Sequence, residues 1–140
     1  MYRCSTAALA VARDNAAQLG LVVRFLQGDW FAPVAGERFD LVLSNPPYLP
    51  EDDPHLPSLR HEPRSALVSG PTGMESIAAI CSDAPAHLRA GGWLLLEHGN
   101  TQGAQARAVL GAAGFARVET WQDIEGRDRA SGGQWTGASR

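Results

Sequence analysis

The tetrapeptide Asn45-Pro46-Pro47-Tyr48 holds the residue types of this sequence that are best suited to chemistry. It directly follows an apolar run at 39–44 that has the composition of a buried strand. Proline has no N–H and a fixed φ, so two prolines stop strand pairing and impose a rigid loop at the strand's carboxyl end, where open α/β sheets bind ligands. That loop offers unpaired carbonyls, the Asn45 amide and the aromatic face of Tyr48. Such a set suits a planar –NH2 group and predicts chemistry on an amide or exocyclic amine nitrogen.

The elements around this loop alternate between helix and strand. Apolar spacing predicts a helix that begins at Ser5 or Thr6 and stops at Gly20, and another through 77–88 that Pro85 kinks or breaks. The further predicted elements are strands at 22–26, 39–44, 93–97, 115–121 and 130–135, a turn at 90–92, and a helix at 102–113. This alternation predicts an open α/β sheet that ends in an antiparallel β-hairpin.

A proline-rich stretch separates the tetrapeptide from the following helix. Seven of the chain's nine prolines fall between Pro46 and Pro71, too many for regular secondary structure. Loops of this length inside a compact domain usually serve a function. We therefore expect residues 46–71 to help form the site.

The length, charge and residue composition of the chain exclude several classes of function. The 140 residues suffice for one domain, and the net charge of −3 argues against a nucleic-acid-binding face. The two cysteines are far apart and the four histidines lack ligand spacing, which predicts a reduced, cytoplasmic protein without a metal site. No apolar run is long enough to predict a membrane span, and the sequence leaves the oligomeric state open.

The tetrapeptide after a strand resembles the catalytic loop of S-adenosylmethionine-dependent methyltransferases that modify planar nitrogens. That group includes DNA and rRNA amino-methyltransferases and the release factor glutamine methyltransferase family. Further stretches resemble the last of these in particular, in the expected order along nearly the whole chain. They are 10–16, Gly28-Asp29-Trp30-Phe31, His61-Glu62-Pro63-Arg64 with Ala66, Leu67 and Gly70, 92–99, and Gly126-Arg127-Asp128-Arg129. The resemblance implies the C-terminal part of a Rossmann-like class I methyltransferase catalytic domain.

The resemblance also implies a role for each matching residue on the acceptor side. Asn45, Pro46, Pro47 and Tyr48 would form the catalytic loop and bind the substrate. The Asn45 side-chain oxygen and the Pro46 carbonyl would accept hydrogen bonds from a glutamine amide, while Tyr48 packs on the amide plane. Glu62 would shape the entrance of the substrate tunnel. For its neighbours Arg60, His61 and Arg64, a solvated charged loop is nearly as good an interpretation.

On the donor side, the resemblance implies that S-adenosyl-L-methionine is the cofactor. Asp29 would accept a hydrogen bond from the adenine amine, Trp30 would line the adenine ring, and Asn45 would border the cofactor as well. On the residues alone, an ordinary Gly-Asp turn beside a core tryptophan is the preferred reading of this pair. Only the spacing to Asn45 favours the cofactor role.

The sequence also departs from the family pattern. The expected glycine-rich loop and acidic strand end are not found, and the acidic position aligns with Arg3. We therefore expect one N-terminally truncated catalytic domain over 1–140, without the first strands of the sheet and with weak cofactor binding.

By resemblance, the function is methyl transfer to a glutamine side-chain amide of class 1 peptide chain release factors, impaired or lost in this chain. A DNA or rRNA amino-methyltransferase and a non-catalytic remnant stay open as alternatives. Glu97 reads equally well as facing the pocket or as capping a helix. We interpret Gly132-Gly133-Gln134, the tripeptide that release factors present for methylation, as a coincidence within a terminal hairpin.

Overall fold

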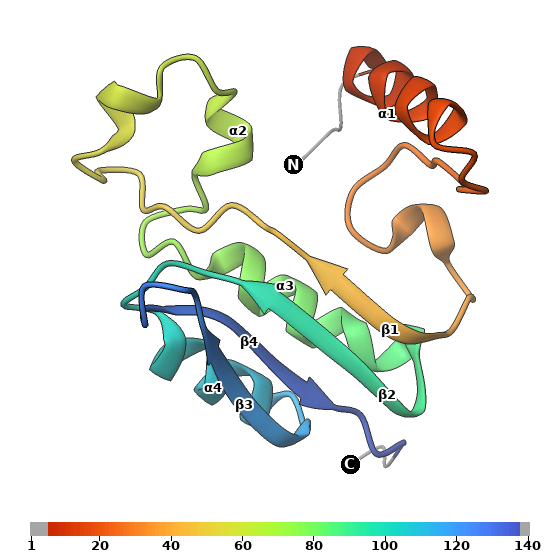
Figure 1. Cartoon of the computed structure of the whole chain (residues 1–140). Helices are drawn as coiled ribbons and strands as arrows, with labels where there is room; N and C mark the ends of the chain where they lie inside the picture. The colour runs from red at the N-terminus through yellow and green to blue at the C-terminus, as the bar shows by residue number, and fades with distance from the viewer. Residues whose placement is uncertain (1–5, 138–140) are drawn as a thin grey trace. The chain divides into compact units, whose positions relative to one another are not determined.

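The computed structural model describes residues 6–137, and Figure 1 shows the order of the elements. The helices are α1 (Thr6–Gln18), α2 (Arg64–Leu67), α3 (Glu75–Asp83) and α4 (Gly103–Ala112), with 3-10 turns at Ala32–Val34, Leu56–Leu59 and Ala84–His87. The strands are β1 (Phe39–Ser44), β2 (Leu88–Glu97), β3 (Ala116–Gln122) and β4 (Asp128–Gln134). The chain divides into two compact units, of which the first ends at Ala35 and the second begins at Gly36.

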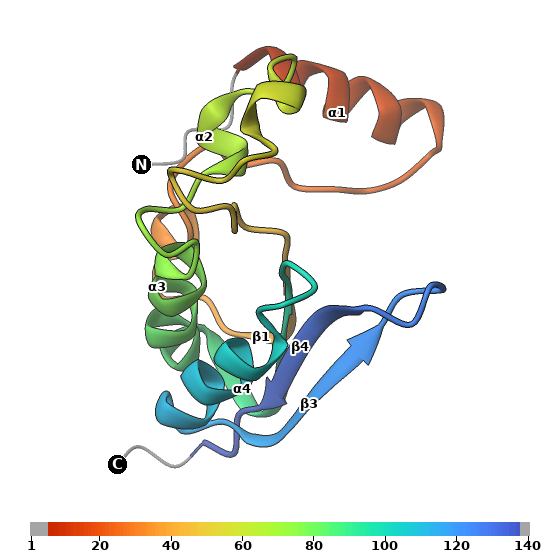
Figure 2. The same ribbon diagram turned by 90° about the vertical axis from the view of Figure 1, so that its left-hand side faces the viewer.

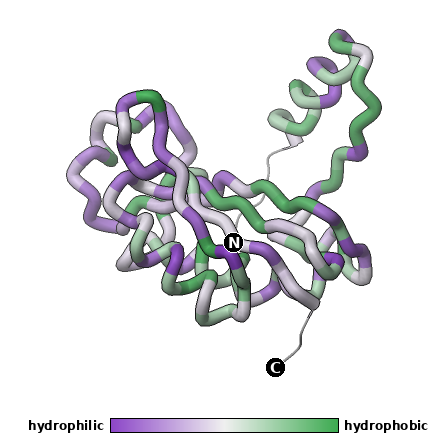
Figure 3. Tube along the Cα trace, turned by 60° about the horizontal axis from the view of Figure 1, so that its bottom comes forward, coloured by the Kyte–Doolittle hydropathy of each residue, from purple (hydrophilic) through white to green (hydrophobic). Residues whose placement is uncertain are grey.

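The first unit consists of α1 and an extended segment. The helix ends as predicted at Gly20, which has a left-handed φ of +65°. The Gly20 N–H donates a hydrogen bond to the Ala17 carbonyl, and the Leu21 N–H donates one to the Ala16 carbonyl. The predicted strand at 22–26 is wrong, because this segment has no hydrogen-bonded strand partner among the described residues. A segment that is not paired with a neighbouring strand is no part of a sheet. Three of its hydrophobic side chains, those of Val22, Val23 and Leu26, are exposed, Val22 completely, and the segment is the green stretch that follows the helix in Figure 3.

The second unit is a four-stranded mixed sheet in the order β1-β2-β4-β3. β1 and β2 run parallel, whereas β4 is antiparallel to both of its neighbours, β2 and β3. The predicted α/β sheet with a terminal antiparallel hairpin is confirmed, and the hairpin partners lie close to their predicted ranges. Because β1 and β2 are parallel, the loops that follow them leave the sheet at the same edge.

Both longer helices of this unit cover one face of the sheet (Figure 2). Alternation along β2 sends its fully buried leucines toward them and its other side chains to the opposite face. The buried apolar side chains of this unit include Ile77, Ile80, Leu88, Leu94, Leu96 and Leu110. On the other face, Leu41 and Leu43 are exposed and the rings of Trp93 and Trp121 lie 6.5 Å apart. This packing fixes which residues reach the ends of β1 and β2.

Two local expectations need correction. Residues 90–92 form no turn ahead of a strand, since β2 begins at Leu88 and runs through both glycines with an irregular register against β1. The Gly91 N–H bonds the Trp135 carbonyl and the Trp135 N–H bonds the Gly92 carbonyl, so this stretch is paired. The proline-rich segment is not devoid of regular structure either, because it holds a 3-10 turn and α2.

Pro85 acts as predicted on the helix that precedes β2. The α-helix ends at Asp83, and a 3-10 turn with the proline in its first positions continues to His87. No helix among residues 6–137 is long and apolar enough to cross a membrane.

Candidate functional site

The Asn-Pro-Pro-Tyr loop (residues 45–48) leaves the carboxyl end of β1. Pro46 and Pro47 are buried, Tyr48 is half-buried and Asn45 is exposed. The two buried prolines thus anchor the loop in the protein. The side-chain amide of Asn45, which stands between the strand and the prolines, stays accessible. This is the arrangement that a strand followed by two prolines predicts.

A cavity of about 240 Å³ lies between this loop and the proline-rich segment that follows it. Its lining comprises Asn45, Pro46, Pro47, Tyr48, Leu49, Leu59, Glu62, Ala66 and Leu67. Two backbone hydrogen bonds hold the segments together, from the Leu49 N–H to the Leu67 carbonyl and from the Ser69 N–H to the Leu49 carbonyl, each 2.9 Å long. The structure therefore places Glu62 in the lining of the same cavity as the tetrapeptide.

A second, more open hollow of about 360 Å³ lies between the ends of the two parallel strands. It is lined by Leu43, Ser44, Asn45, Leu95, Leu96, Glu97 and Ala130. Glu97 caps none of the helices in the described part of the chain. Its carboxylate accepts a long hydrogen bond of 3.5 Å from the Tyr48 hydroxyl, so it faces the site.

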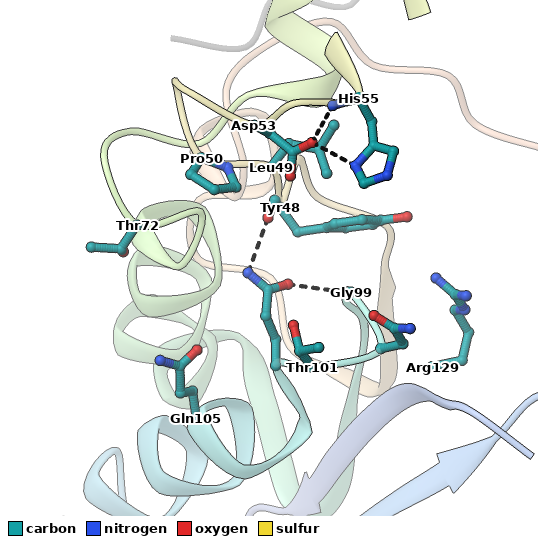
Figure 4. Close-up of a pocket in the computed structure, with 12 residues that line it drawn as sticks. Tyr48, Leu49, Pro50, Asp53, His55, Thr72, Gly99, Thr101, Gln105 and Arg129 are labelled. Atoms are coloured by element: carbon teal, nitrogen blue, oxygen red, sulfur yellow. Dashed lines mark hydrogen bonds and ion pairs between the residues drawn. The ribbon is translucent and has the colours of Figure 1, made fainter. Parts of the chain in front are cut away.

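The Tyr48 ring also borders a third cavity, of about 640 Å³ (Figure 4). This cavity is lined by Tyr48, Leu49, Pro50, Asp53, His55, Thr72, Gly99, Asn100, Thr101, Gln102, Gln105 and Arg129. Sequence reasoning missed the residues after β2 in this set. The available signal was the polar run 100–102, which follows the buried apolar run at 93–97 after two residues.

Electrostatics at Tyr48 favour its neutral form. Burial raises the pKa of the Tyr48 phenol above its usual value of 10.0, and the neighbouring Glu97 carboxylate raises it further. Arg129 opposes the shift without cancelling it. At neutral pH the ring is therefore an uncharged face with a hydroxyl donor.

The other predicted pair, Asp29 and Trp30, lies in the first unit on a turn that leads into the 3-10 turn Ala32–Val34. The Ala32 N–H bonds the Asp29 carbonyl at 3.0 Å, and Trp30 has a left-handed φ of +44°. One carboxylate oxygen of Asp29, Oδ1, is buried and has no hydrogen-bond partner among the described residues. Buried acceptors are normally paired, so this oxygen is suited to a donor supplied by a ligand, such as the exocyclic amine of adenine.

Residues 6–137 hold no group of three or more histidine, cysteine, aspartate or glutamate side chains arranged to bind an ion.

The sequence of the chain is similar to those of known methyltransferases. Residues 1–58 match the family described as "Methyltransferase small domain". The chain is 51% identical over 136 residues to the release factor glutamine methyltransferase of Xylella fastidiosa, covering 95% of the chain and 50% of that protein. It is 47% identical over 131 residues to the protein of the same name from Pseudomonas aeruginosa, covering 91% and 48%. The chain is a relative of the release factor glutamine methyltransferases.

The resemblance seen in the sequence is thereby confirmed, over a chain that spans about half the length of the curated relatives it matches. A solved structure, "Crystal structure of Methyltransferase from Pyrococcus furiosus", superposes with a TM-score of 0.68 at 20% identity, covering 96% of this chain and 60% of that one. TrmN from Thermus thermophilus gives a TM-score of 0.57, also at 20% identity, with coverage of 94% and 34%. These similarities show that the fold is that of class I methyltransferases.

Proposed function

We propose that this chain carries the acceptor side of a methyltransferase site that acts on a planar amide nitrogen. The observation that carries the proposal is the convergence of Asn45, Tyr48 and Glu62 on one cavity at the carboxyl end of β1. The resemblance of these residues to the family's catalytic loop and the names of the relatives support it.

The reaction follows from the acceptors at the loop. The Asn45 side-chain oxygen and the Pro46 carbonyl accept the two hydrogens of a primary amide, and the Tyr48 ring covers the amide plane. Held in this way, the nitrogen would present its lone pair to a methyl group supplied by the cofactor, whose sulfonium would leave as a neutral thioether, and the nitrogen would release one proton to water. Positioning and exclusion of water supply most of the acceleration, so no strong base is required.

S-adenosyl-L-methionine would supply a methyl group already activated on a sulfonium. Asp29 fits its adenine through the unpartnered Oδ1, which accepts from the amine. Trp30 would line the ring, and Asn45 would border the transferable methyl group.

The proposed substrate is a glutamine side chain of class 1 peptide chain release factors, which the names of the relatives support. The net charge of −3 disfavours the nucleic-acid alternative. The polypeptide would reach the loop through the cavity that Glu62 borders.

Incubation of the chain with methyl-labelled S-adenosylmethionine and a class 1 release factor tests the proposal. Because cofactor binding should be weak in this chain, we expect slow labelling of one glutamine, and a further loss of at least about hundredfold in rate for Asn45→Ala, which removes the positioning of the amide. Asn15→Ala, on the exposed surface of α1, is the matched control and should keep the rate. Label on DNA or rRNA, or no transfer by the unmodified chain, would contradict the proposal.

A further inference from the structure

Gln102 connects the loops that follow the two parallel strands. Its side-chain oxygen accepts a 2.8 Å hydrogen bond from the Gly99 N–H, and its side-chain nitrogen donates a 3.0 Å hydrogen bond to the Tyr48 carbonyl (Figure 4). Gln102 is 8% exposed and stands at the start of α4. One side chain thereby links the strand-end loop of β2 to the Asn-Pro-Pro-Tyr loop of β1.

The two bonds require an amide at this position. A backbone N–H needs an acceptor and a carbonyl needs a donor, so only a side chain with both groups at its tip satisfies both partners. This requirement also fixes the orientation of the Gln102 amide. An ionised carboxylate could serve Gly99 but would repel the Tyr48 carbonyl.

The surrounding residues leave room for this amide and little else. A Cβ on Gly99 would lie 3.0 Å from Gln102 Oε1. A Cβ on Gly73 would overlap the Tyr48 carbonyl oxygen and lie 3.0 Å from Gln102 Nε2. Two glycines therefore frame the amide, which argues that the contact is built into the fold.

The far end of the link is held firmly. The Gly99 carbonyl accepts a 2.8 Å bond from Nδ1 of the buried His98, since a carbonyl can only accept. In the neutral imidazole, Nε2 then accepts from Ser131, at 2.8 Å. Ser131 in turn accepts from Thr120 at 2.7 Å, and Thr120 from Arg107 at 2.6 Å. This one-way chain of donors ties Gly99 to β4, β3 and α4.

We infer that Gln102 is a positioning residue, which sets the Tyr48 carbonyl and with it the Asn-Pro-Pro-Tyr loop against the rigid end of β2. The inference rests on the proposed function in one respect: the loop it positions is the loop proposed to hold the substrate amide. Gln102 itself need not touch substrate or cofactor.

Residue-resolved amide exchange and the Tyr48 carbonyl carbon resonance, measured by NMR on the whole chain, test the link directly. For Gln102→Ala we expect about tenfold faster exchange at Gly99 and a shifted Tyr48 carbonyl resonance, since each lost bond lowers the cost of local opening. Gln102→Glu at neutral pH should keep Gly99 protected but shift the Tyr48 resonance, a split that simple loss of packing would not produce. Should Gln102→Ala fail to fold, the Gln102→Glu variant decides alone.

Gln105→Ala is the matched control, because this glutamine lies one turn further along α4, lines the same cavity and makes no side-chain bond to the loop. Unchanged exchange and resonance in both Gln102 variants, or equal changes in the control, would overturn the inference.

The transfer assay separates this inference from the proposed function. If the unmodified chain methylates a release factor, Gln102→Ala should lower kcat about hundredfold and leave the KM for the release factor unchanged. An effect on KM alone would overturn the positioning role. If the unmodified chain transfers nothing while the NMR result is as expected, the proposed function fails and the positioning of the loop stands.

Discussion

Substitution of Gly73 by alanine should destabilise the chain through the site loop. Gly73 has a φ of +78°, and an added Cβ would overlap the Tyr48 carbonyl oxygen and lie 3.1 Å from the Pro50 nitrogen. The left-handed conformation costs alanine about 1–2 kcal/mol. Overlap with backbone atoms, which cannot rotate away, adds about 1–3 kcal/mol. We expect the free energy of unfolding to fall by about 2–5 kcal/mol in total.

Gly126→Ala separates these two contributions. Gly126 has nearly the same φ, +76°, but an added Cβ would meet nothing within 4 Å. Urea unfolding at 25 °C, followed by tryptophan fluorescence, should therefore show a loss of about 1–2 kcal/mol for this control. Equal losses for the two variants would refute the close approach of Gly73 to the Tyr48 loop. A larger loss for Gly73→Ala would show that the overlap with the site loop has to be relieved.

Three further predictions concern buried polar groups. Ser131→Ala should lower the free energy of unfolding, measured in urea, by about 1–3 kcal/mol, because the buried His98 Nε2 loses its hydrogen-bond donor. A loss near zero would contradict the hydrogen bond between Ser131 and His98. Absorbance titration at 295 nm should place the pKa of the Tyr48 phenol above its usual value of 10.0. The contribution of this group to stability is therefore complete below pH 10 and is lost as the pH rises through the raised pKa. Tyr48→Phe should remove both effects, and a titration midpoint at or below 10 would contradict the burial of the hydroxyl. Burial raises the pKa of the Cys81 thiol to about 12, so at pH 8 this thiol should react with a disulfide reagent only after denaturant is added. Equal reaction rates of Cys81 with and without denaturant would contradict its burial.

Local sequence features were sufficient to predict the loop and most of the elements. Two successive prolines after an apolar run define a strand end without knowledge of the partner strand, so β1 and the accessible Asn45 were predictable. Gly20 and Pro85 end their helices through their own backbone properties, and both were placed correctly. Such features act within a few residues, which is the range that a single sequence reports.

Features that depend on distant partners were not predictable in this way. The segment 22–26 is as apolar as a strand, yet it forms none because no partner strand is bonded to it in the described chain. Residues 90–92 look like a turn, but Gly91 and Gly92 pair with Trp135 and belong to β2. Gln102 binds a carbonyl 54 residues away, and nothing in its immediate sequence indicates that contact.

The tripeptide Gly132-Gly133-Gln134 shows how partners decide the meaning of a motif. It lies inside β4, where a Cβ on Gly132 would overlap the Leu95 side chain and a Cβ on Gly133 would lie 2.8 Å from Phe115. The glycines are therefore required by side chains that cross the strand. The Gln134 side chain donates a 2.9 Å bond to the Gly91 carbonyl. Packing within the sheet accounts for all three residues, whereas the Asn45 side chain makes no such bond within residues 6–137 and lies exposed at the end of β1, where a ligand has access to it.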